Sequence, residues 1–169
     1  MPIRYAHYLS LFEAEINIKV NSNRGTSGID GSLSTAVGAA LTTKKIVTII
    51  IGDLAFFYDR NALWNNYLPN NLRIVVLNNH GGGIFRILDG SSKLEELDTY
   101  FETKNTYTAK NTALDADLDY YFCSKKEDLV NILNTFFDKS DKAKILEIES
   151  DSKLNTEIFN NFKKLIQTS

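Results

Sequence analysis

Two polar segments of this sequence have the residue types of a metal site that binds a phosphate. Asp53 follows an apolar run that ends in Gly52, and Asn79 ends the next such run, just before the glycines 81–83. Carboxylate and amide oxygens suit Mg²⁺, which is usually bound through few protein groups plus substrate phosphates. Glycines after a strand let the backbone approach an anion. An isolated Asp53 would be interpreted as a helix N-cap. Beside Asn79 and the glycines, it predicts a metal ligand, with a backbone carbonyl as a third ligand.

The apolar pattern predicts the elements that must position these residues. Short β-branched runs, apolar on both alternations, indicate strands buried on both faces of a parallel sheet. Apolar residues at helical spacing lie between them, and a capping box, Ser124 and Glu127, marks one helix start. This alternation predicts an α/β fold with a doubly wound, mostly parallel sheet and helices on both faces. The predicted strands are residues 16–22, 45–53, 72–79 and 143–150, and the predicted helices are residues 30–43, 124–137 and 154–166.

Three glycine-bearing segments follow the first three predicted strands. They are residues 23–31, 52–56 and 78–85. In a doubly wound sheet all three lie at the carboxyl edge, where ligands bind. They contain neither the P-loop pattern nor the dinucleotide G-x-G-x-x-G spacing. The sequence therefore predicts a phosphate site of another kind at this edge.

The bulk properties are those of one globular domain. With 169 residues, 43% of them hydrophobic, the chain can bury one core. Its 19 basic and 21 acidic residues are mixed along the sequence, so neither nucleic acid nor a membrane surface is an expected partner. The single cysteine, Cys123, is predicted to be a buried thiol, and the lack of a signal peptide or membrane-spanning run predicts a cytoplasmic protein. Residues 89–119 are polar and weakly periodic, which predicts a lid with one short helix.

The segment from Gly52 to Asn79 resembles the thiamine-diphosphate motif, in which GDG is followed by NN at the end of the next strand. Leu54 replaces the glycine of the third position. With SNRGTSGIDG before it and GGGIF after it, this departure resembles one branch of that superfamily. That branch is the 2-succinyl-5-enolpyruvyl-6-hydroxy-3-cyclohexene-1-carboxylate synthases of the menaquinone pathway. The distinctive motifs cover residues 4–85, and the remainder is compatible with the same domain but less diagnostic.

The resemblance implies that residues 1–169 are the cofactor-binding domain of a longer, three-domain enzyme. The glutamate that activates the cofactor belongs to an N-terminal domain in this family, so no catalytic residue is expected here and the chain alone is expected to be inactive. The family's reaction decarboxylates 2-oxoglutarate and adds the succinyl group to isochorismate, which implies those two partners. Thiamine diphosphate and Mg²⁺ (or Mn²⁺) are the implied cofactors. A homodimer or homotetramer is the implied assembly.

The resemblance also implies a role for each site residue. Asp53, Asn79 and the carbonyl of Gly81 would bind the metal ion, while Ile29 would support the bent cofactor and His80 would only turn the chain. Both substrates are polyanionic, and guanidinium groups pair well with carboxylates. The residues implied in cofactor binding are Ser27, Gly28, Ile29, Gly52, Asp53, Leu54, Ala55, Asn79, Gly81, Gly82, Gly83 and Ile84. Those implied in substrate binding are Arg4, Arg24, Ile84, Phe85 and Leu88.

Two other functions remain open at this point. One is a different thiamine-diphosphate-dependent 2-oxoacid decarboxylase or synthase, which Leu54 and the GGGIF segment disfavour. The other is a non-catalytic module that holds a phosphate ligand, which predicts binding without a metal. Asp53 together with Asn79 disfavours that module.

Overall fold

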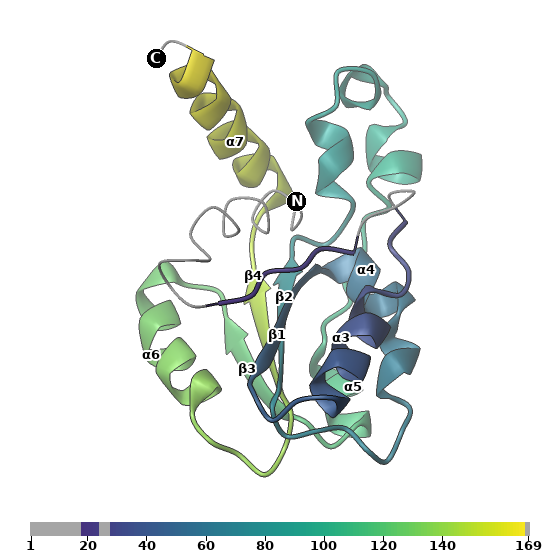
Figure 1. The fold of residues 1–169 in the computed structure, drawn as a ribbon. Helices are drawn as coiled ribbons and strands as arrows, with labels where there is room; N and C mark the ends of the chain where they lie inside the picture. The colour runs from purple at the N-terminus through teal and green to yellow at the C-terminus, as the bar shows by residue number, and fades with distance from the viewer. Residues whose placement is uncertain (1–17, 24–27, 168–169) are drawn as a thin grey trace.

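The computed structural model describes residues 18–23 and 28–167 and shows an α/β fold built on a parallel sheet (Figure 1). Within these residues the sheet has four strands in the order β1-β2-β4-β3, and each neighbouring pair is parallel. The doubly wound fold predicted from the sequence is confirmed. The strands are β1 (Val47–Gly52), β2 (Leu72–Asn78), β3 (Asp119–Cys123) and β4 (Lys144–Glu149).

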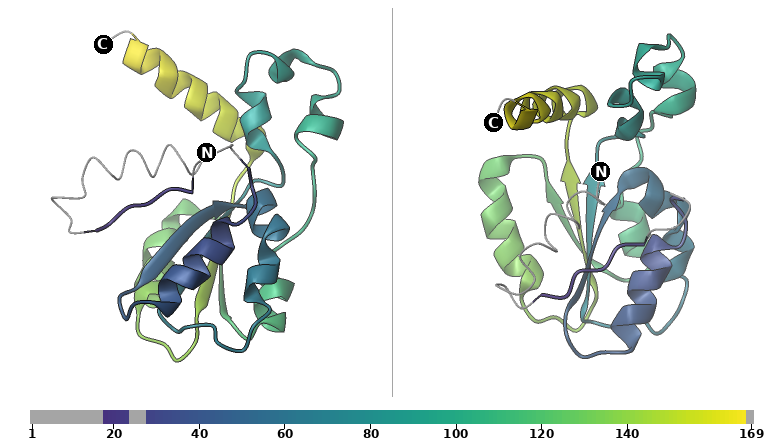
Figure 2. Two further views of the ribbon diagram at one scale, coloured as in Figure 1. Left: turned by 45° about the vertical axis from the view of Figure 1, so that its right-hand side comes forward. Right: turned by 45° about the horizontal axis from the view of Figure 1, so that its top comes forward.

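Helices cover both faces of the sheet, as the two views of Figure 2 show. Successive strand residues point to opposite faces. Ile74 and Val76 therefore pack under α3, α4 and α5 on one face, while Val75 packs with α6 on the other. Cys123 belongs to the second core and is 3% exposed, which confirms the buried thiol. The helices are α3 (Ser32–Leu41), α4 (Asp53–Tyr58), α5 (Lys110–Asp115), α6 (Lys126–Phe137) and α7 (Ser152–Gln167).

The register of the sheet brings the polar segments to one edge. Gly52 at the end of β1 pairs with Leu77 of β2, and Asp53 and Asn78 are the next residues along the chain from this last pair. On the other side of β2, Asn78 pairs with Glu149 of β4. Helix α4 begins directly at Asp53, without a loop. The carboxyl edge therefore holds the start of a helix and a polar turn side by side.

Two parts of the chain extend beyond the carboxyl edge (Figures 1 and 2). One follows β2 and forms the short turns η2 (Gly83–Arg86), η3 (Ser91–Lys93) and η4 (Leu97–Phe101) before it returns to the sheet at α5. The other is α7, whose predicted apolar face stays in solvent: Leu154, Ile158 and Phe162 are each more than half exposed. Within the described residues, no helix is both long and apolar enough to cross a bilayer.

Three details differ from the sequence prediction. Residues 18–22, within the strand predicted at 16–22, form no strand, because β1 pairs only with β2 among the described residues. Helix α6 begins at Lys126 after the N-cap Lys125, and no side chain caps it, so the predicted capping box is wrong. The sequence prediction also missed β3 and α5, since both are short and lie in or beside the polar stretch interpreted as a lid.

Candidate functional site

Asp53 is the first residue of α4, and its side chain is almost completely buried, at 2% exposure. It accepts hydrogen bonds from the backbone of Leu54 and Gly81 and a long one from Asn105, 3.5 Å from Nδ2 to Oδ2. Burial raises the pKa of Asp53, and these bonds oppose the rise without cancelling it. The helix N-cap is Gly52, so the N-cap interpretation of Asp53 does not hold. An incompletely compensated buried carboxylate is suited to a cation.

The turn after β2 bends sharply at His80, whose φ is 60°. Asn78 Oδ1 accepts a hydrogen bond of 3.0 Å from the backbone N–H of His80, which fixes the bend. The predicted role of His80 in turning the chain agrees with this geometry. Its ring also meets Glu149, 3.0 Å from Nε2 to Oε1, a contact that the sequence did not predict. The turn brings Gly81 to the side of the sheet edge where Asp53 lies, because the backbone N–H of Gly81 donates to the Asp53 carboxylate.

The glycines of this turn are in close contact with the segment that ends η4. A Cβ atom on Gly81 would lie 2.7 Å from the carbonyl oxygen of Glu102, and Gly82 N–H donates to that same oxygen at 2.6 Å. On Gly83 a Cβ atom would lie 2.8 Å from Asn79 Nδ2. The sequence interpretation assigned these glycines to space for a diphosphate. The structure adds a second cause, since backbone carbonyls lie close to Gly81 and Gly82 and the Asn79 side chain lies close to Gly83.

The side chain of Glu102 ties this region together. It is completely buried and accepts hydrogen bonds from Arg86 of η2, through Nε at 2.8 Å and through Nη2, and from Ser152 at the start of α7. Arg86 also contacts Asp98, and these acidic partners raise the pKa of Arg86. Glu102 therefore connects the glycine turn through its backbone carbonyl, η2 through its ion pair with Arg86 and α7 through Ser152.

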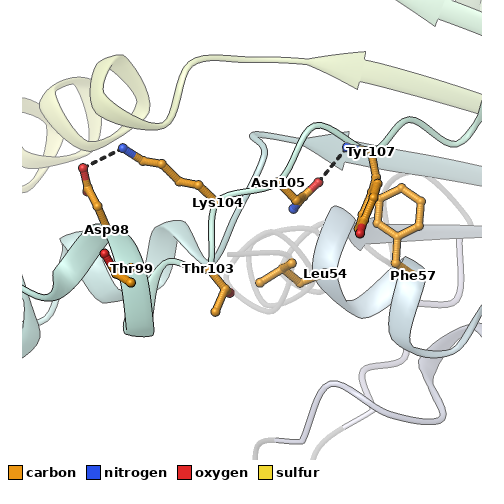
Figure 3. Close-up of a pocket in the computed structure, with 8 residues that line it drawn as sticks. All are labelled: Leu54, Phe57, Asp98, Thr99, Thr103, Lys104, Asn105 and Tyr107. Atoms are coloured by element: carbon orange, nitrogen blue, oxygen red, sulfur yellow. Dashed lines mark hydrogen bonds and ion pairs between the residues drawn. The ribbon is translucent and has the colours of Figure 1, made fainter.

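An open pocket of about 540 Å³ lies beside the start of α4 (Figure 3). Leu54 forms an apolar wall, and Lys104 lies opposite with its Nζ atom 2.7 Å from Asp98. The rings of Phe57 and Tyr107 meet edge to face, with centroids 5.6 Å apart. The lining therefore combines apolar side chains, such as Leu54 and Phe57, with charged and polar ones. The lining residues are Leu54, Phe57, Asp98, Thr99, Thr103, Lys104, Asn105 and Tyr107.

The predicted site residues fall into three groups. Asp53, Gly81 and the Asn79 turn are brought together at the carboxyl edge, with Gly52 and Leu54 beside them. Ala55 packs against the core, Phe85 is partly buried on η2, and four residues lie on exposed surface, namely Gly28, Ile29, Ile84 and Leu88. Arg4, Arg24 and Ser27 lie outside the described residues.

Three residues of the site were missed in the sequence: Glu102, Asn105 and Glu147. Only Glu147 had a usable signature, because it is a charged residue in the middle of an apolar strand, where burial demands polar partners. Among the described residues, no three His, Cys, Asp or Glu side chains gather as a metal site. A metal ion at this edge would therefore take amide and carbonyl oxygens in addition to Asp53.

The chain matches one protein family, described as thiamine pyrophosphate enzyme, C-terminal TPP binding domain, over residues 6–148. It belongs to that family. Its relatives include proteins named 2-succinyl-5-enolpyruvyl-6-hydroxy-3-cyclohexene-1-carboxylate synthase from Cytophaga hutchinsonii (57% identical over 169 residues, 100% of this chain), Christiangramia forsetii (49% over 165 residues, 96%) and Flavobacterium psychrophilum (46% over 162 residues, 96%). The resemblance to these synthases seen in the sequence is confirmed. The chain spans 28 to 30% of the length of these relatives.

Proposed function

We propose that this chain is the cofactor-binding domain of a synthase that decarboxylates 2-oxoglutarate and adds the succinyl group to isochorismate in menaquinone biosynthesis. The observation that carries this proposal is the match at 57% identity over the whole chain to a synthase of that name. The chain spans 30% of the length of that relative. We propose that the reaction belongs to a longer polypeptide in which residues 1–169 would form one of three domains. The chain alone is expected to be inactive, since the activating glutamate would come from another domain.

The metal ion would be Mg²⁺ or Mn²⁺, held by Asp53, the side-chain oxygen of Asn79 and the carbonyl of Gly81. The buried carboxylate of Asp53, with its raised pKa, supports this assignment because a cation would supply the missing compensation. The surroundings of Gly52 also support the assignment. A Cβ atom on Gly52 would meet no atom within 4 Å, so its backbone faces open space in which a ligand could lie. A diphosphate bound to the metal would lie against Gly52 and the 81–83 turn, with Ser27, Gly28 and Ala55 near its ends.

Thiamine diphosphate supplies a carbanion-stabilising group for decarboxylation of a 2-oxoacid. The residues of this chain would bind and orient. Ile29 would support the bent cofactor, and Ile84, Phe85 and Leu88 would form an apolar wall that excludes water from the reacting carbons. Phe85 is already held by Phe101, with ring centroids 5.7 Å apart. Arg4 and Arg24 would bind substrate carboxylates.

The proposed assembly is a homodimer or homotetramer in the cytoplasm, with small-molecule substrates and neither nucleic acid nor a membrane as partner. The balanced charge of 19 basic and 21 acidic residues supports the absence of a polyanion partner. The exposed apolar face of α7 supports contact with other parts of the assembly.

Calorimetric titration of the chain with thiamine diphosphate, with and without Mg²⁺, tests the proposed cofactor site. We expect binding that requires Mg²⁺ in the unmodified chain and that is lost in Asp53→Asn, because the amide keeps the shape of Asp53 but removes its charge. The matched control is Asp115→Asn, which removes one exposed carboxylate at the end of α5 and is expected to bind normally.

Two results would contradict the proposal. Binding that depends on neither Mg²⁺ nor Asp53 would favour the non-catalytic phosphate-binding module. Metal-dependent binding that survives in Asp53→Asn would place the metal elsewhere in the chain. If the cofactor site is supported, release of CO₂ from 2-oxoglutarate by the longer polypeptide, tested against other 2-oxoacids, would decide between this synthase and other enzymes of the superfamily.

A further inference from the structure

Glu147 is a completely buried carboxylate in β4, the strand next to β2. Within residues 18–23 and 28–167, no Lys, Arg or His side chain forms an ion pair with it. Instead it accepts three hydrogen bonds: from Asn78 Nδ2 at 2.6 Å, from the Tyr120 hydroxyl at 2.6 Å and from the backbone N–H of Ala109 at 3.0 Å. Burial and the bond to Glu147 both raise the pKa of Tyr120, so its hydroxyl remains a donor. The carboxylate is thus satisfied by donors from three separate elements.

In one of these donors, Asn78, both polar groups of the side chain have hydrogen-bond partners. Its Nδ2 donates to Glu147 and to the carbonyl oxygen of Tyr107 at 2.9 Å, while its Oδ1 accepts from His80 N–H at 3.0 Å. A carboxylate can only accept and a backbone N–H can only donate. Glu147 therefore allows a single orientation of the Asn78 amide. That orientation is the one that supports the bend at His80, between Asn79 and Gly81.

A second connection runs through the segment that returns from η4. Ala109 N–H and the Tyr107 carbonyl are both tied to the Glu147–Asn78 pair. Tyr107 N–H in turn donates to Asn105 Oδ1 at 3.0 Å, which leaves Asn105 Nδ2 directed at Asp53. Asn105 N–H donates to the His80 carbonyl at 3.1 Å. Glu147 thus connects to both segments that flank Asp53.

We propose that Glu147 is a positioning residue for the metal and diphosphate site, because it fixes the 78–81 turn and the 105–109 segment relative to each other. This inference rests on the proposed function for its link to the metal. It assigns Glu147 no contact with cofactor or substrate. Glu147 acts through Asn78, and the bend that Asn78 supports orients Asn79 and Gly81.

The substitution Glu147→Gln tests this role because glutamine keeps the shape but has only one acceptor oxygen. If that oxygen faces Ala109 and Tyr120, the glutamine NH₂ group forces the Asn78 amide to turn over, and His80 N–H loses its acceptor. If it faces Asn78, Ala109 N–H loses its acceptor instead. The matched control is Tyr120→Phe, which removes one bond to the same carboxylate but leaves the Asn78 and Ala109 bonds intact.

The first measurement is amide hydrogen exchange of the full 169-residue chain without ligand. In Glu147→Gln we expect exchange at His80 or Ala109 to become at least about tenfold faster, the change that loss of a buried hydrogen bond of about 1.4 kcal/mol produces. In Tyr120→Phe both amides are expected to keep their rates, even if the melting temperature falls. Unchanged exchange at both amides in Glu147→Gln would overturn the proposal, whatever the chain binds.

The second measurement is titration with Mg²⁺ at a fixed concentration of thiamine diphosphate. Residues that orient metal ligands typically change metal affinity by about 10- to 100-fold, so we expect a Mg²⁺ affinity at least about tenfold weaker in Glu147→Gln and unchanged in Tyr120→Phe. Equal losses in the two variants, or no loss in either, would overturn the link to the metal. If the unmodified chain shows no Mg²⁺-dependent binding, the proposed function fails for this chain, and hydrogen exchange alone decides whether Glu147 positions the turn.

Discussion

Both ends of the sheet bury charged side chains, but the two ends use them differently. At the amino end, Arg73 and Lys144 are register partners on β2 and β4, exposed by only 2% and 3%. Arg73 donates to four backbone carbonyls at 2.7 to 3.0 Å, two of them at the end of α6, and Lys144 donates to the Thr135 carbonyl at 2.7 Å. These cations donate hydrogen bonds to carbonyl groups at the end of α6, which have no hydrogen-bond partner within the helix.

At the carboxyl end, two buried carboxylates differ from each other. Glu147 accepts three hydrogen bonds from neutral donors at 2.6 to 3.0 Å. Asp53 accepts hydrogen bonds from the backbone of Leu54 and Gly81, but its side-chain donor Asn105 is 3.5 Å away, and burial still raises its pKa. The comparison shows that burial of a charge does not by itself identify a functional residue. A buried charge whose bonds are complete acts on the structure around it, as Glu147 acts on the 78–81 turn, and one whose bonds are incomplete is available to a ligand.

The largest effect on stability is expected from a substitution at the amino end of the sheet. Arg73→Ala leaves buried carbonyls without donors and a cavity beneath α6, so we expect a loss of about 3 to 5 kcal/mol in the free energy of unfolding. Urea denaturation measures this loss. At temperatures where the variant remains folded, its affinity for thiamine diphosphate and Mg²⁺ should equal that of the unmodified chain. A weaker affinity would break the distinction between the two ends.

A pair of glycine substitutions gives an intermediate effect at the carboxyl end. Gly81→Ala places a Cβ atom 2.7 Å from the Glu102 carbonyl, so one of the two backbones must move, and we expect a loss of about 2 kcal/mol in stability together with weaker cofactor binding. Gly52→Ala meets no atom within 4 Å and should leave stability nearly unchanged. We expect it to weaken cofactor binding only, through contact with the diphosphate. Thermal melting and calorimetry on both variants separate these effects, and normal binding by Gly52→Ala would remove Gly52 from the site.

The smallest expected effect is a gain in stability, from a substitution of Asp53. Because burial raises the pKa of Asp53 in the folded state, that state holds the proton more tightly than the unfolded chain does. The stability this provides is present at low pH and is lost as the pH rises through the raised pKa. Asp53→Asn should therefore stabilise the ligand-free chain by about 1 kcal/mol at neutral pH, an advantage that disappears in acid. Melting curves across pH 3 to 8 would measure it, and a destabilised variant at neutral pH would show that Asp53 is fully compensated.

The sequence was sufficient for the general fold because its core strands are apolar on both faces. β1, β2 and β4 were predicted within two residues of their observed bounds, and α3, α6 and α7 were also found. β3 was not predicted, since its residues 119–123 begin with an aspartate and follow a polar stretch. The strand predicted at 16–22 was wrong for residues 18–22, because a β-branched pattern does not provide a neighbouring strand to pair with.

The site was only partly predictable for a related reason. Asp53 and Asn79 follow strands, so the topology alone places them at one edge. Asn105 and Glu102 reach that edge from a segment of short turns, whose path depends on tertiary contacts such as the Arg86–Glu102 ion pair and not on local pattern. Their positions could not be derived from spacing. The roles of Arg4, Arg24 and Ser27 stay predictions, because these residues lie outside the described part of the chain.

The strand order β1-β2-β4-β3 also determines when the site can form during synthesis. A nascent chain emerges amino end first, and pairing between distant segments is slow. When residues up to Cys123 have left the ribosome, Asp53 and Asn79 are already present, but the place between β2 and β3 is empty. Only the later arrival of residues 144–149 brings Glu147 against Asn78. The carboxyl edge of the sheet is therefore among the last parts of this domain to mature, and a chain released before β4 would hold Asp53 and Asn79 without the geometry around them.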